Sequence, residues 1–171
     1  SAELDDTFPT VFRNLALARF NKFEQEEQAV ADMEKAFALD PTDARILMEM
    51  NQLYKKVNKS IAFRFGLLEK YPELVEERDD LYLEKIALHI LKAEFNTAYE
   101  CLMKRNFHPW EGGEGKVSGA YVHSLTGMAK QAIAKEQYQE AIDALEKARS
   151  YPVNLGEGKL PDARENQINY W

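Results

Sequence analysis

The residue types best suited to binding chemistry gather in two short segments that resemble each other. One reads His108-Pro109-Trp110-Glu111-Gly112-Gly113-Glu114-Gly115-Lys116, and the other reads Tyr151-Pro152-Val153-Asn154-Leu155-Gly156-Glu157-Gly158-Lys159, with matching positions 43 residues apart. Glycine permits unusual backbone angles and close approach of another chain, and the start of a following helix offers free amides to an anion or a hydroxyl-rich ligand. The segments therefore predict a binding edge made of His108, Trp110, Glu111, Glu114, Lys116, Tyr151, Glu157 and Lys159.

The same two segments also have a purely structural interpretation. Glycine commonly ends a helix, Lys and Glu keep a loop solvated, and Trp110 would then pack beneath its loop as a local plug. Carboxylates beside aromatic rings are what glycosidases use, but such neighbours arise by chance in an acidic chain. An open loop also lacks the enclosed cleft that raises the pKa of an acid. We therefore expect no catalytic residue, while the binding and structural interpretations both stay open.

Nucleotide binding through a phosphate-binding loop is excluded by the spacing around each Gly-Lys pair. Such a loop needs a glycine five residues before Gly-Lys and a Ser or Thr after it. Trp110 and Val117 occupy these positions in the first segment, and Val153 and Leu160 occupy them in the second. We expect no cofactor.

Metal binding and nucleophilic catalysis also lack a suitable pattern. His89, His108 and His123 are expected on different elements, without helical pairing or a nearby cysteine. Cys101 lies within an apolar helical pattern and has no neighbour that would lower its pKa. We expect no metal site, a packing role for His89, and an inert Cys101.

A repeat along the chain predicts the fold that carries these segments. The clearest unit reads Leu125-x2-Met128-Ala129-x2-Ala132, then Tyr138-x2-Ala141-x3-Leu145-x2-Ala148, before Pro152. Small residues at a helix crossing with large apolar residues on either side are the tetratricopeptide spacing. One hairpin cannot bury its apolar stripe alone, so such units stack. The sequence predicts an all-α chain, folded as a right-handed solenoid of about four helical hairpins and a terminal helix.

The units of this single predicted domain are expected at residues 10–41, 43–72, 76–109 and 117–152, with a final helix at residues 161–171. The alanines expected at the helix crossings are Ala29, Ala62, Ala98 and Ala141. The acidic run at residues 76–80 is expected to start a helix, because carboxylates are favourable at a helix N-terminus. No polar cap closes the array, so we expect a fragment of a longer chain.

The concave face of such a solenoid is lined chiefly by the first helix of each hairpin. In this register the face is predicted to contain Arg13, Leu17, Asn51, Tyr54, Leu83, Ala87, His123 and Lys130. The mixture is moderately apolar and lacks the repeated Lys, Arg and Asn pattern that clamps a peptide carboxylate. An intramolecular partner therefore fits this face better than a chaperone tail.

Composition and charge exclude several classes of partner. The chain has 22 Lys plus Arg against 29 Asp plus Glu, a net charge of -7, which repels nucleic acid and anionic membrane surfaces. No apolar run approaches the roughly 18 residues that a membrane helix needs. The single cysteine excludes an intramolecular disulfide and is compatible with a reducing compartment. We expect a cytoplasmic protein that binds neither nucleic acid nor membranes.

Three stretches, at residues 71–84, 106–117 and 154–159, carry a more specific resemblance. The string Phe107-His108-Pro109-Trp110-Glu111-Gly112-Gly113-Glu114-Gly115-Lys116 resembles large bacterial tetratricopeptide proteins that have an N-terminal β-rich domain of unknown function. The similarity covers most of residues 10–171. It implies an excised segment of such a protein, in which the β-rich region looks like a carbohydrate-active sandwich.

The expected function is a non-enzymatic scaffold for protein–protein or interdomain contacts. Its partner would be a second protein or another domain of the parent chain. The alternative is a carbohydrate- or anion-binding edge that assists an attached carbohydrate-active domain. An independent enzyme has no residue constellation in its favour.

Overall fold

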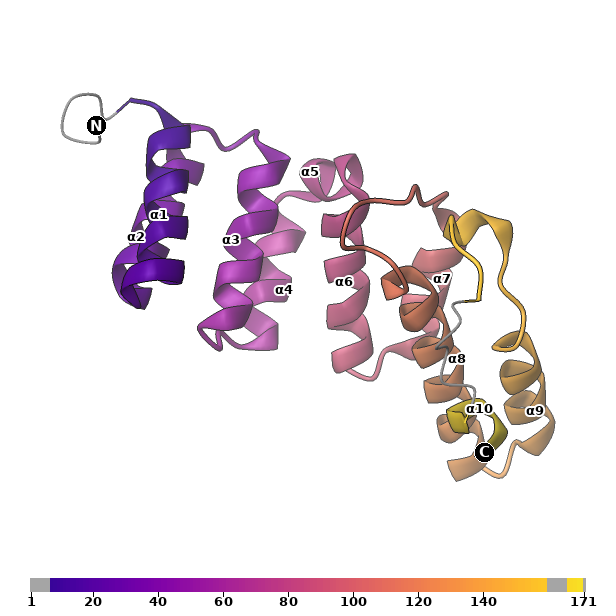
Figure 1. The fold of residues 1–171 in the computed structure, drawn as a ribbon. Coiled ribbons are helices and arrows are strands. Elements are labelled where there is room, and N and C mark those ends of the chain that lie inside the picture. The colour runs from indigo at the N-terminus through magenta and orange to yellow at the C-terminus, as the bar shows by residue number, and fades with distance from the viewer. Residues whose placement is uncertain (1–6, 160–165, 171) are drawn as a thin grey trace. The chain divides into compact units, whose positions relative to one another are not determined.

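The computed structural model describes residues 7–159 and 166–170, which form helices joined by turns and loops (Figure 1). No β-strand occurs within these residues. In chain order the helices are α1 (Pro9–Phe23), α2 (Glu26–Leu39), α3 (Ala44–Lys56), α4 (Ile61–Lys70), α5 (Pro72–Glu77), α6 (Asp79–Leu91), α7 (Phe95–Lys104), α8 (Lys116–Ala134), α9 (Tyr138–Lys147) and α10 (Asn166–Tyr170), with a short 3₁₀ turn η1 (Val153–Leu155). The all-α prediction is confirmed over this part of the chain.

The chain divides within α6 into two compact units, Ser1–Tyr82 and Leu83–Trp171. In the first unit α1 packs on α2, α2 packs on α3, and α3 contacts α4 and α5. The α1–α2 crossing is close because Ala16 and Ala29 are both fully buried there, as the sequence predicted for Ala29. The Arg13 guanidinium forms an ion pair with Glu49, which fastens α1 to α3.

The prediction that Ala62 lies at a helix crossing in the first unit is wrong. Ala62 is exposed, and α4 instead buries Arg64 and Leu68. The Ser60 hydroxyl accepts a hydrogen bond from Phe63 N at 3.1 Å and so caps the start of α4. Arg64 Nε donates to Asn51 Oδ1 of α3 at 3.1 Å. This buried polar contact, rather than a small side chain, sets which side of α4 faces α3.

The short helix α5 was not predicted. Pro72 begins it at a position where proline is favourable, and Leu74 and Val75 are buried. The acidic run is split between two helices, because Glu76 and Glu77 end α5 while Asp79 and Asp80 lie in the first turn of α6. The expected helix start is therefore present, but at Asp79.

In the second unit α7 packs on α8, and α8 packs on α9. A Cβ atom at Gly127 of α8 would lie 2.4 Å from the Phe95 ring, so glycine lets α7 and α8 approach closely. Ala98 and Ala141 are buried, as the repeat predicted. Only α10 is described from the predicted final helix, and the rest of that prediction lies outside the described residues.

Candidate functional site

The two similar segments lie against each other in the second unit. Phe107 N donates to Asn154 O at 2.8 Å, which joins the backbones of the two loops. The Asn154 side-chain amide donates to Leu102 O and Arg105 O, both at 3.0 Å. Carbonyls at the end of a helix need partners from elsewhere. The second loop supplies them for α7, so the two loops lie together in the second unit.

The Glu157 carboxylate connects the second loop to the start of α8. One oxygen accepts from Gly115 N at 2.8 Å, and the other accepts from Ser118 N at 2.6 Å. Gly115 is the N-cap residue and has φ 74°, a conformation that favours glycine. A carboxylate at this end of a helix satisfies free amides and interacts favourably with the helix dipole. Glu157 is therefore a helix cap supplied from about forty residues further along the chain.

Two more glycines allow close contacts within and between these loops. Gly156 has φ 70°, and a Cβ atom there would lie 2.2 Å from Phe107 O. A Cβ atom at Gly113 would lie 2.3 to 2.7 Å from atoms of the Trp110 ring, so the indole rests directly on the Gly113 backbone. Trp110 thus acts in part as the plug that the structural interpretation expected, while its side chain stays half-buried.

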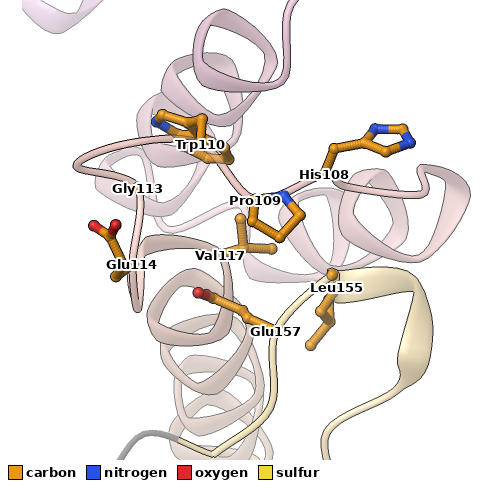
Figure 2. A pocket seen from close by; sticks show the side chains of 9 residues that line it. His108, Pro109, Trp110, Gly113, Glu114, Val117, Leu155 and Glu157 are labelled. Atoms are coloured by element: carbon orange, nitrogen blue, oxygen red, sulfur yellow. The ribbon is translucent and has the colours of Figure 1, made fainter.

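A cavity of about 170 Å³ opens between the two loops and the start of α8. Its lining residues are His108, Pro109, Trp110, Gly113, Glu114, Val117, Leu155, Gly156 and Glu157. Figure 2 shows Pro109, Val117 and Leu155 around its centre, while the His108 ring and the Glu114 carboxylate are directed outward. The cavity therefore has an apolar floor with ionisable side chains at its rim.

The structure brings half of the predicted binding edge to this cavity. His108, Trp110, Glu114 and Glu157 line it. Glu111, Lys116 and Lys159 are exposed but do not line the cavity, and the Tyr151 ring packs 6.5 Å from the Tyr121 ring.

The sequence analysis missed Pro109, Val117 and Leu155 as lining residues. The sequence does mark these positions, because each is an apolar residue in a polar loop or at a helix start. A polar residue would be expected there if the side chain were exposed to solvent.

The predicted concave face is corrected at three positions where the side chain is buried. Asn51 is fully buried against Arg64, and Leu83 is buried as well. Tyr54 is buried and donates from its hydroxyl to Glu34 at 2.6 Å. Burial, together with this hydrogen bond, raises the pKa of Tyr54, so the phenol stays neutral. These side chains serve helix packing and offer no contact to a partner.

The other residues of the predicted concave face belong to two different units. Arg13 is held by Glu49, and Leu17 is half-buried, both in the first unit. His123 and Lys130 are exposed in the second unit, where the His123 ring stacks on Phe95.

The remaining reactive side chains have structural neighbours. His89 is nearly buried, with Nδ1 2.7 Å from a Glu94 carboxylate oxygen, as its expected packing role requires. Cys101 is half-buried in α7. Among the described residues, no group of three or more His, Cys, Asp or Glu side chains could hold a metal ion.

None of the described helices is long and apolar enough to cross a membrane. Comparison of the chain with models of known protein families found no match.

Proposed function

We propose that this chain is a non-enzymatic scaffold of the tetratricopeptide type, whose hairpins stack as a solenoid and whose paired loops bind a protein or another domain. The alanines buried at the α1–α2, α7–α8 and α8–α9 contacts support the repeat assignment. The resemblance of the loop segments to bacterial tetratricopeptide proteins supports it independently.

The observation that carries the binding proposal is the preformed cavity between the loops. Asn154 and Glu157 fix the second loop to the ends of α7 and α8, and Gly156 lets it touch the first loop. A surface held in its binding geometry before the partner arrives loses little conformational entropy on association. The loops are therefore suited to recognition as well as to capping.

The size of the cavity indicates the class of ligand. Small-molecule and cofactor sites usually enclose about 300–1,000 Å³. The present cavity, at about 170 Å³, is smaller than that. Protein interfaces commonly depend on a few anchor residues that fill such pockets. We therefore propose an apolar anchor residue of a protein partner, inserted over Pro109, Val117 and Leu155.

A phage-displayed library of short random peptides tests this proposal. Selected peptides are titrated by calorimetry against the wild type, the double variant Trp110→Ala/Glu114→Ala, and Tyr138→Ala, an aromatic control on a different helix. Anchor residues are worth about 2 kcal/mol or more, so the double variant should bind at least about tenfold more weakly, and the control should bind normally. Circular dichroism checks that all three proteins are folded. Failure to select any peptide, or equal affinity for the double variant, would reject the loop site.

A saccharide is a second candidate, because the rim combines the Trp110 ring with the ionisable side chains of His108 and Glu114. Aromatic rings pack on the apolar faces of sugars, and carboxylates accept hydrogen bonds from hydroxyl groups. Titration of a Trp171→Phe variant with diverse oligosaccharides, followed by Trp110 fluorescence, tests it. A fluorescence change that saturates would favour the saccharide, and an unchanged spectrum would exclude it.

A further inference from the structure

Two carboxylates line the described cavity between the loops, and only one of them has its charge available to a ligand. Both oxygens of Glu157 accept hydrogen bonds from backbone amides at the start of α8, at 2.8 and 2.6 Å. The helix dipole and these amides therefore compensate the charge of Glu157. The Glu114 side chain is exposed, and its carboxylate is directed outward at the rim (Figure 2).

The other charged side chains of the loops leave the Glu114 side of the rim negative. Among the described residues, no Lys or Arg lines the cavity, and Lys116 and Lys159 are exposed outside it. Glu111, earlier in the first loop, is exposed as well. Figure 2 shows the His108 ring and the Glu114 carboxylate on opposite sides of the cavity. The rim is therefore asymmetric, with its negative charge on one side only.

The cavity floor and the rim carboxylate select different parts of a partner segment. Pro109, Val117 and Leu155 surround the centre, where an apolar side chain loses its contact with water. Glu114 lies at the rim, where an ammonium or guanidinium group can form a charge-assisted hydrogen bond with it. Like charges brought together at an interface are unfavourable. A basic residue beside the apolar anchor therefore fits this site, and an acidic residue does not.

We propose that the partner segment carries a lysine or arginine beside its apolar anchor residue, and that this cation pairs with the Glu114 carboxylate. The inference rests on the proposed function, because it needs a protein segment in the cavity, and it adds the chemical class of that segment. It also gives the segment a direction, with the basic residue on the Glu114 side and away from His108.

A second copy of this chain is a poorer partner than a basic segment of another protein. The chain has a net charge of -7, so two copies repel each other as they approach. A basic segment is attracted instead, and complementary charge raises the association rate of such a complex.

Peptides selected from the phage-displayed library on the wild-type chain are the probe. We expect their sequences to share a Lys or Arg close to a common apolar residue. One selected peptide is synthesised with this basic residue and with Gln in its place. Surface plasmon resonance then gives the association and dissociation rates of both peptides with the wild type, Glu114→Gln and the control Lys116→Gln.

The expected effect is that of an ion pair at the rim of an interface. Glu114→Gln should weaken binding of the basic peptide by about two- to fivefold, chiefly through slower association, and should reduce its salt dependence. The Gln peptide should bind the wild type and Glu114→Gln equally well, since the pair is already lost. Lys116→Gln changes a charge of the same loop outside the cavity and should not weaken binding.

Failure of this inference is distinguishable from failure of the loop site. Peptides that need Trp110 but share no basic residue, or that bind Glu114→Gln as tightly as the wild type, would overturn the inference alone. Acidic peptides that Lys116→Gln weakens would also overturn it. Failure to select any peptide would reject the loop site and this inference together. A dimer in sedimentation equilibrium that Glu114→Lys dissociates would overturn it as well, because the occupant would then be a second copy.

Discussion

Replacing Glu157 should destabilise the start of α8, although Glu157 lies about forty residues further along the chain. Its two carboxylate oxygens accept hydrogen bonds from Gly115 N and Ser118 N, at 2.8 and 2.6 Å. Glu157→Ala removes both acceptors and the charge. Glu157→Gln keeps the size of the side chain and one oxygen, but removes the charge and the second acceptor.

The expected cost follows from the two interactions that are lost. Removing a side-chain cap at a helix N-terminus costs about 0.5–2 kcal/mol. A partly buried carboxylate there is worth up to about 2 kcal/mol through the helix dipole, a contribution that overlaps with the cap. We therefore expect Glu157→Ala to lower the free energy of unfolding by about 2 kcal/mol, and Glu157→Gln by about 1 kcal/mol.

Urea unfolding followed by tryptophan fluorescence measures this cost, because both tryptophans, Trp110 and Trp171, belong to the second unit. The matched control is Glu114→Gln, the equivalent carboxylate of the first loop, which is exposed and should cost less than about 0.5 kcal/mol. Hydrogen exchange should also accelerate at the amides of Gly115 and Ser118 in the Glu157 variants. Equal stability of Glu114→Gln and Glu157→Gln would refute the cap.

Two other predictions concern helix packing and pH. Gly127→Ala should lower the free energy of unfolding by about 1–3 kcal/mol, because the new methyl overlaps the Phe95 ring, whereas Gly119→Ala on the same helix meets open space and should raise it by about 0.5–1 kcal/mol. Urea unfolding measures both, and effects of the same sign would contradict the packing. Hydrogen bonds from the Thr42 hydroxyl and amide lower the pKa of Asp40, so their stabilisation is present above the ordinary pKa and is lost as the pH falls through the folded-state value. Thr42→Val should raise the pKa of Asp40 in an NMR titration, and an unchanged pKa would count against this.

The repeat pattern predicted the helical hairpins and most of their crossing residues. Ala29, Ala98 and Ala141 are buried as expected. Ala62 is not, because the buried Arg64 contact with Asn51 occupies the inward side of α4. The spacing of residues along one helix predicts which of its faces is apolar. It does not predict a buried polar pair between two helices, because that pair depends on how the helices are oriented.

The sequence also predicted that the two loops share one edge, but it gave no sign of their different roles. A local capping box has a recognisable spacing, with its carboxylate three residues after the cap. Glu157 caps α8 from a different repeat, so no short-range pattern marks it. The sequence treats Glu114 and Glu157 as equivalent, and only the folded chain distinguishes them.

The side chains of the two loops therefore have different main roles, although Trp110 of the first loop also packs on Gly113. Asn154 and Glu157 use their side chains to satisfy the ends of α7 and α8, so the structural interpretation applies to the second loop. The side chains of Pro109 and Glu114 are exposed beside the cavity, so recognition should depend on the first loop. Under conditions where every variant is folded, Glu114→Gln should therefore weaken peptide binding without loss of stability. Glu157→Gln should lower the stability and leave the peptide affinity unchanged. If both substitutions weakened binding equally, the two loops would have to be treated as one recognition surface.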